Sequence, residues 1–347
     1  YKNNLKCKLI HFIILIKMIN MPLKLFTSWK FLELVFLCLY NGQMSTVTPV
    51  KWKQFNICQV ESVETLIEYG QNNQYPNGIP KLIHNVYENH RIPFQYKDLV
   101  ENCMKINPDV KFVFWTDESA VNLVRQYFPA QFSVYQTYLN SKVEPLKRSD
   151  LNRYFILMKF GGIYMDLDTR CQKPFNLVMV NETCILSTEN QAQSLILWNQ
   201  DCIAMNSLMA CTSQHKFFRF ILKNVRKFEN ISILELTGPI WLTKMFHLYK
   251  IMKDSHNDKD AVVLADSYMF SPQVDPYLIL KCIRIRKNWK TVGCQKLRLH
   301  RKTARKKIRK AIVVHLFMHL GYANRKYLIK KRVKICLKLL NFTLIQI

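Results

Sequence analysis

The sequence predicts an α/β fold, a sheet whose strands are connected by crossover helices. Two observations predict it. Short apolar runs rich in β-branched and aromatic residues alternate along the chain with longer segments of helical periodicity, and turn residues separate the two kinds. In addition, 49% of the 347 residues are hydrophobic, which is enough for a packed core and excludes intrinsic disorder over most of the length.

The expected elements follow one another from residue 79 onwards. Asn107-Pro108 ends the first helix, and Gly161-Gly162 ends the last one. Ligands of such sheets bind beyond the carboxyl ends of the strands, so the strand ends are the places to search for a site. In chain order we expect a strand at 79–87, a helix over 96–106, a strand at 110–115, helices over 118–127 and 145–160, and a strand at 163–168.

Three flanking segments differ from this central part. Residues 1–40 hold a short basic region and an apolar run at 31–40, which predicts a signal peptide or signal anchor; a buried amphipathic helix is the alternative. Residues 41–78 are polar and rich in Asn and Gln, and we expect a stem or linker there. The catalytic domain is then expected over 79–280, followed by a basic segment at 281–347.

The net charge of +27 is concentrated near the end of the chain. Residues 281–347 contain 21 Lys and Arg and no acid, whereas the first 280 residues contain 30 basic and 24 acidic side chains. The basic segment is a phosphate-binding region, a solvated tail or a poorly selected stretch of sequence. No zinc-finger, helix-turn-helix or aromatic RNA-binding motif accompanies it, and the eleven cysteines form no C-x-x-C pair.

The strand at 163–168 carries two carboxylates on one face. Side chains alternate along a strand, so Tyr164, Asp166 and Asp168 face one side, and the apolar residues between them face the other. Two like charges at a strand end are best tolerated with a cation between them. Carboxylate oxygens suit Mg²⁺ or Mn²⁺, which complete their coordination with water and substrate phosphates.

The preceding helix carries a charged pair on an apolar face. Asp150 and Arg153 share that face with Leu146, Tyr154 and Leu157. Charges at this position are costly unless they meet each other or a ligand. The pair is therefore either an internal ion pair or a part of a polar cleft beside Asp166 and Asp168.

The spacing of residues 148–168 resembles the signature of family 32 glycosyltransferases, which share the GT-A fold. The segments 79–84, 107–117, 215–218 and 237–239 also resemble that family, as does Asn206, so the resemblance covers about 79–275. It is closest in detail to the inositol-phosphoceramide mannosyltransferase and α-1,4-glycosyltransferase group. The resemblance therefore implies a GT-A type nucleotide-sugar transferase fold, which is a Rossmann-like mixed sheet flanked by helices.

The resemblance also implies roles for single residues. Asp166 and Asp168 would hold Mn²⁺ or Mg²⁺ at the diphosphate of a nucleotide-sugar, and Asp150 and Arg153 would bind hydroxyls of the donor sugar. These four form the expected catalytic set, with Asp166 and Asp168 as the metal ligands. The reaction would be a front-face displacement that retains anomeric configuration, without a protein nucleophile.

Five further residues are expected at the cofactor. Tyr87 stands where the family usually has a base-stacking Trp. Trp115 and Asp117 are expected near the nucleotide, and Tyr164 beside the carboxylates. His315 lies in a segment, 311–322, that is expected to complete the active site, because the family has a His-containing strand there; a buried strand histidine is the alternative. The family's Ser-Trp that follows this strand is replaced here by Leu320-Gly321.

The expected function is that of a metal-dependent retaining glycosyltransferase. It would move a hexose from a GDP- or UDP-sugar to a glycan or glycolipid such as a glycosphingolipid. A single-pass type II protein of the Golgi membrane, with a lumenal catalytic domain, fits the expected signal anchor. The alternatives are a catalytically impaired family member that acts as a binding protein, and a nucleic-acid-binding protein that acts through its basic C-terminus.

Overall fold

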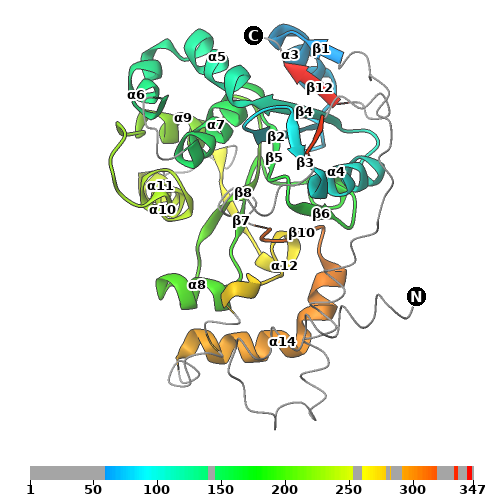
Figure 1. Ribbon diagram of the computed structural model, residues 1–347, viewed down its shortest axis with the longest axis vertical. Coiled ribbons are helices and arrows are strands. Elements are labelled where there is room, and N and C mark those ends of the chain that lie inside the picture. Colours follow the sequence, from blue (N-terminus) through cyan, green and yellow to red (C-terminus); the bar gives the residue numbers. More distant parts are fainter. Residues whose placement is uncertain are drawn as a thin grey trace, which may run out of the picture. The chain divides into compact units, whose positions relative to one another are not determined.

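The computed structural model describes most of the chain from residue 59 onwards (Figure 1). The described ranges are 59–139, 145–252, 260–278, 282, 291–318, 332–334 and 342–345. The signal peptide or anchor expected at 1–40 lies outside these ranges. Within them, none of the helices combines the length and the apolar character that a membrane span needs.

The centre of the fold is a mixed sheet of eight strands in the order β1-β12-β4-β2-β5-β8-β7-β9. Neighbouring strands are parallel except that β8 runs antiparallel to β5 and β7. These strands are β1 (Gln59–Glu61), β2 (Leu82–Tyr87), β4 (Lys111–Thr116), β5 (Gly162–Met165), β7 (Cys184–Thr188), β8 (Ala204–Cys211), β9 (Val263–Ala265) and β12 (Phe342–Ile345). Two small antiparallel pairs join β6 (Thr169–Cys171) to β10 (Val313–His315) and β3 (Arg91–Pro93) to β11 (Arg332–Lys334).

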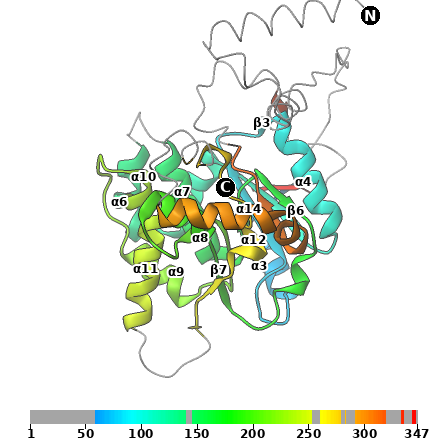
Figure 2. The same ribbon diagram turned by 90° about the horizontal axis from the view of Figure 1, so that it is seen from below.

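Helices cover both faces of this sheet (Figures 1 and 2). The predicted α/β class, a mixed sheet flanked by helices, is confirmed. The helices are α3 (Val63–Asn72), α4 (Phe94–Ile106), α5 (Asp117–Tyr127), α6 (Pro129–Leu139), α7 (Pro145–Phe160), η2 (Phe175–Leu177), α8 (Gln191–Trp198), α9 (Lys216–Lys223), α10 (Ile233–Leu236), α11 (Pro239–Met252), α12 (Ser267–Phe270) and α14 (Val292–Lys310).

Strand alternation divides the core into two apolar clusters. On β4, Val113 and Trp115 join the cluster beneath α5, α6, α7, α9 and α11, while Phe112 and Phe114 join the cluster beneath α4 and α12. Strand β5 alternates in the same way, so Tyr164 faces the α7 side. Because the central strands are covered on both faces, nearly all of their residues are buried.

A tight connection joins α7 to β5. Gly161 and Gly162 both have positive φ, +65° and +88°. A side chain at Gly162 would lie 2.8 Å from the carbonyl oxygen of Leu82, so only glycine fits between the two strands there. This turn places the end of α7 directly beside the start of β5, and thereby sets the two motif-bearing elements against each other.

The structure departs from the sequence-based expectation in three places. Strand β5 ends at Met165, so Asp166 and Asp168 lie in the turn that follows it instead of on the strand. Helix α6 was not predicted. The last part of the expected linker, over 63–72, folds into helix α3, because Ser62 caps its first turn and Leu66 is buried in the core.

Candidate active site

A cavity of about 400 Å³ opens at the carboxyl end of β5. Walls from α7, α8, β8 and the segment after β10 surround it. This is the sheet edge at which ligands of α/β folds bind. Seven of the residues predicted from the sequence line it: Tyr87, Asp150, Arg153, Tyr164, Asp166, Asp168 and His315.

The backbone holds Asp166 and Asp168 in fixed positions. The N–H of Asp166 donates to the carbonyl of Ser207 at 2.9 Å, which ties the turn to β8. The carboxylate of Asp168 accepts the N–H of Met318 at 3.0 Å. Phe317, at φ 51°, adopts a left-handed conformation that is unfavourable for a side chain of its size and that brings the Met318 N–H round to Asp168.

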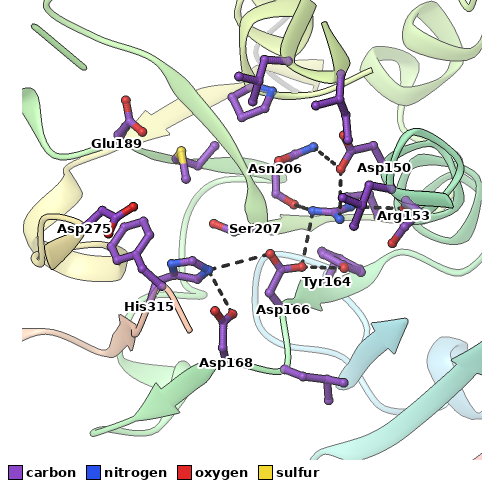
Figure 3. A pocket seen from close by; sticks show the side chains of 18 of the residues that line it. Asp150, Arg153, Tyr164, Asp166, Asp168, Glu189, Asn206, Ser207, Asp275 and His315 are labelled. Carbon is purple, nitrogen blue, oxygen red and sulfur yellow. Dashed lines mark hydrogen bonds and ion pairs between the residues drawn. The ribbon is translucent and has the colours of Figure 1, made fainter. Parts of the chain in front are cut away.

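His315 lies between the two carboxylates. Its Nε2 is 3.1 Å from Asp168 Oδ1 and 3.8 Å from Asp166 Oδ2 (Figure 3). Burial alone would lower the pKa of His315, but Asp168 and Asp166 raise it to about 10, so the ring carries a positive charge there. The sequence also allowed a purely structural strand histidine; the structure places this ring in the site.

These three side chains fit a divalent cation. One ligand atom from each lies within 4.8 Å of the others. The imidazolium already supplies the positive charge that the two carboxylates require, and a metal ion would satisfy the same oxygens. Buried Nδ1 of His315 has no hydrogen-bond partner within the described residues. The ring must release a proton before one of its nitrogens can bind a metal ion. The two carboxylates are ligands suited to Mn²⁺ or Mg²⁺.

Asp150 and Arg153 form an ion pair and line the cavity as well. Arg153 Nη2 is 3.0 Å from Asp150 Oδ1, and Arg153 Nη1 is 3.4 Å from Asp166 Oδ1. The sequence left two alternatives, an internal pair or a polar cleft beside Asp166, and the structure shows both features at once. Burial raises the pKa of Asp150 to about 6, although Arg153 opposes that shift.

Two residues outside the predicted site orient this pair. Asn206 Nδ2 donates to Asp150 Oδ1 at 2.9 Å, and its carbonyl accepts Arg153 Nη1 at 2.7 Å. Thr237 Oγ1 donates to Asp150 Oδ2 at 3.3 Å. The sequence offered two signals for Asn206: it is part of the family resemblance, and it interrupts the buried strand β8 with a polar side chain.

The two tyrosines of the predicted site have different surroundings. The hydroxyl of buried Tyr164 donates to Asp166 Oδ1 at 2.7 Å, and the guanidinium of Arg153 lies 4.6 Å from the centre of its ring. Tyr87 is half-buried at the cavity wall, with its ring in edge contact with Tyr96. Tyr164 therefore positions the carboxylate, whereas Tyr87 presents an aromatic surface to the cavity.

Two predicted residues lie elsewhere. Trp115 is fully buried, and its indole N–H donates to His84 Nδ1 at 3.1 Å, so its side chain belongs to the core. Asp117 begins α5 and pairs with Arg148. Neither residue is among those that line the cavity, so their expected place near the nucleotide remains a prediction.

The wall formed by α8 was not predicted from the sequence. Buried Glu189, just before the helix, accepts hydrogen bonds from Gln193 at 2.8 Å and from Trp198 at 3.2 Å. Asp275 lies on the same side of the cavity (Figure 3). These carboxylates face the cavity opposite Asp150 and Arg153, so the cavity has polar groups at both ends.

The family comparison agrees with this geometry. Residues 93–186 match the family model described as "Glycosyltransferase sugar-binding region containing DXD motif". This segment contains Asp150, Arg153, Asp166 and Asp168. The predicted resemblance to the DXD-containing glycosyltransferases is thereby confirmed, as is the prediction of a glycosyltransferase at the level of the family.

Curated relatives are 25–29% identical to the chain over the aligned residues. "Mannosyl phosphorylinositol ceramide synthase SUR1" of Saccharomyces cerevisiae is 29% identical over 181 residues, which are 50% of this chain and 44% of that protein. "Inositol phosphoceramide mannosyltransferase 1" of Schizosaccharomyces pombe is 29% identical over 181 residues, 49% of this chain and 52% of that protein. The chain thus spans about half the length of these relatives.

The solved structures that are similar to the chain are more distant. "PaToxG Glycosyltransferase" shows 19% identity and a TM-score of 0.39, and covers 54% of this chain and 76% of its own. A "glycosyltransferase involved in the glycosylation of the major capsid of PBCV-1" shows 11% identity and a TM-score of 0.31, and covers 67% of this chain and 91% of its own. At these scores the likeness carries no argument about substrate or mechanism.

Proposed function

We propose that the chain is a metal-dependent retaining glycosyltransferase that moves a hexose from a GDP- or UDP-sugar to a glycan or glycolipid. One observation carries the proposal. Asp166, Asp168 and His315 present ligand atoms within 4.8 Å of one another, and the Asp150–Arg153 pair borders the same cavity. A cation site beside a hydrogen-bonding pair is the combination that a diphosphate-linked sugar requires.

Asp166 and Asp168, with His315 beside them, would hold the metal ion. When bound, Mn²⁺ or Mg²⁺ supplies electrostatic stabilisation for the departing diphosphate. The protein's own contribution is to orient the donor. Asn206 and Thr237 fix Asp150, so its carboxylate accepts a sugar hydroxyl in one position, and Arg153 donates beside it. Tyr87 offers its ring to the base.

The acceptor is proposed from the relatives. Several are named as enzymes of inositol phosphoceramide mannosylation, so a mannosyl donor and a phosphoinositol sphingolipid are the first pair to test. The described residues contain the disulfides Cys103–Cys171, Cys184–Cys211 and Cys282–Cys294. Disulfides form and persist in oxidising compartments, which supports a lumenal catalytic domain at the Golgi membrane.

The direct test is a panel of GDP- and UDP-sugars with the purified full chain. We expect hydrolysis or transfer of at least one donor in the presence of Mn²⁺, loss of that activity with EDTA, and best recovery with Mn²⁺ because the site leaves coordination positions for water and diphosphate. Release of the sugar and of the nucleotide diphosphate is measured. Activity that survives chelation contradicts the metal site, and binding of a donor without turnover indicates the catalytically impaired alternative.

Tyr87→Ala should weaken nucleotide diphosphate binding by about tenfold, since stacking on an aromatic ring contributes about 1–3 kcal/mol. The protein should stay folded because Tyr87 is only half-buried. Tyr87→Trp is the matched control and should bind at least as tightly as the wild type. Calorimetric titration with GDP and UDP measures both. Equal affinity of Tyr87→Ala and the wild type would show that the base lies elsewhere.

A further inference from the structure

Helix α14 is a basic helix outside the proposed active site. It runs from Val292 to Lys310, 19 residues, and contains no Asp or Glu. Figures 1 and 2 show it lying against α8. Its cationic side chains are Lys296, Arg298, Arg301, Lys302, Arg305, Lys306, Lys307, Arg309 and Lys310.

The inner face of α14 is fixed to the domain. Cys294 and Leu297 are buried in a small apolar cluster with Ala192 of α8. Gly293 lies so close to α8 that an added side chain would meet Ile196 at 2.8 Å. His300 lies within 3.3 Å of the amide of Asn190. These contacts hold one face of the helix against the domain, so the other face is turned outward.

The outward face is a row of exposed cations. Arg298, Lys302, Arg305 and Arg309 recur every three or four residues, and all four are exposed. Within the described ranges no carboxylate forms an ion pair with any lysine or arginine of α14. Like charges at this spacing repel one another and destabilise a helix in water. In a solvated helix, acidic side chains among the basic ones normally reduce this repulsion.

Two exposed aliphatic side chains accompany the cations. Val292 is 59% exposed and Leu299 is 60% exposed. Basic residues together with exposed apolar side chains on a fixed amphipathic helix are the pattern of helices that lie in the interface of an anionic membrane. A nucleic-acid backbone would satisfy the cations but not the aliphatic groups, and α14 has no aromatic side chain on which a base could stack.

We propose that α14 is a docking surface for an anionic lipid bilayer. The cations lie among the phosphate and carboxylate headgroups, and Leu299 and Val292 enter the boundary with the acyl chains. The charge of the helix is complementary to such a surface, and each cation near it contributes to the attraction. This contact is independent of any anchor in residues 1–40.

Docking through α14 has a consequence for the cavity, which rests on the proposed function. Helix α8 joins the two sites: Ala192 and Ile196 contact α14, while Gln193, Leu197 and Trp198 line the cavity. The cavity wall is therefore one helix away from the docking surface. An acceptor carried by a lipid in the same membrane would be presented near that wall.

The test is co-sedimentation of the full chain with vesicles. Vesicles of phosphatidylcholine with about a third of phosphatidylserine are compared with vesicles of pure phosphatidylcholine. Binding of the protein to the pure phosphatidylcholine vesicles measures the part of the affinity that does not depend on lipid charge. The variant combines Arg298→Glu, Lys302→Glu, Arg305→Glu and Arg309→Glu. The matched control combines Arg219→Glu, Lys223→Glu, Lys227→Glu and Lys244→Glu, which are exposed residues of the α9 and α11 region and give the same change in net charge.

We expect the α14 variant to bind the anionic vesicles about a hundredfold more weakly than the wild type, and the control to lose much less. Equal losses in both variants would show that only net charge matters and would overturn the proposal, as would wild-type binding by the α14 variant. Circular dichroism confirms folding, and the same four positions changed to Gln replace the variant if it does not fold.

Two further measurements keep the result unambiguous. Tighter α14-dependent binding to a DNA or RNA duplex than to the anionic vesicles, at the same salt concentration, would overturn the lipid assignment. Donor hydrolysis by the wild type in buffer without vesicles tests the proposed function separately. Failure of that assay with retained α14-dependent vesicle binding would remove the transferase proposal and leave the docking surface in place.

Discussion

Asp168→Asn should lower sugar transfer by about a thousandfold or more while the protein stays folded. The substitution replaces a metal-ligand carboxylate by a neutral amide of nearly the same volume, and electrostatic groups at a reacting centre contribute on this scale. The amide oxygen can still accept the N–H of Met318, so the free energy of unfolding should change by at most about 2 kcal/mol. Steady-state kinetics and thermal unfolding measure the two effects.

Asp109→Asn is the matched control for this prediction. Asp109 is exposed and pairs with Lys81 outside the cavity, so its loss should leave transfer near the wild-type rate. Near wild-type turnover by Asp168→Asn would remove Asp168 from the metal site, whatever the control shows.

Asp150→Asn should lower kcat/KM by about a hundredfold or more at little cost in stability. A site built around a sugar hydroxyl loses a positioned charged acceptor, and Arg153 still has Asp166 as a partner. Binding of the free nucleotide diphosphate, which lacks the sugar, should stay within about tenfold of the wild type. Parallel measurements of sugar transfer and of GDP or UDP affinity separate the effect on catalysis from the effect on nucleotide binding.

The double variant Asp150→Leu, Arg153→Leu distinguishes a catalytic pair from a purely structural one. Apolar replacement of both partners avoids an uncompensated buried charge, so the protein should remain folded but inactive. Lys97→Ala combined with Glu101→Ala removes a half-buried ion pair of α4 outside the cavity and should remain active. Recovery of sugar transfer by the Asp150, Arg153 double variant would show that the pair only stabilises the fold.

The local motif was predictable because its charges conflict with the elements that carry them. Asp150 and Arg153 lie on an otherwise apolar helix face, and Asp166 and Asp168 follow a buried strand. A charged side chain in such a place needs an opposite charge, a hydrogen-bond partner or a ligand. The partners themselves could not be predicted. Asn206 meets Asp150 only because β8 returns antiparallel to β5 in the sheet, a pairing that no local pattern specifies.

Trp115 was expected near the nucleotide because of the family resemblance, and a resemblance in sequence does not fix the direction of a side chain. Trp115 is the next-to-last residue of β4. Strand β4 is covered on both faces, so the Trp115 side chain is buried in the core. Helix α6 was missed for a different reason, because its apolar residues have almost no helical periodicity.

The measurement that most directly tests the central claim is calorimetric titration of the full chain with GDP and UDP, in Mn²⁺ and in EDTA. The claim is that Asp166, Asp168 and His315 hold a divalent cation against a nucleotide diphosphate. We predict binding of one of the nucleotides in Mn²⁺, a loss of at least about tenfold in affinity, or 1.4 kcal/mol, in EDTA, and the same loss in Asp168→Asn with Mn²⁺ present. Equal affinity under all three conditions would contradict the account.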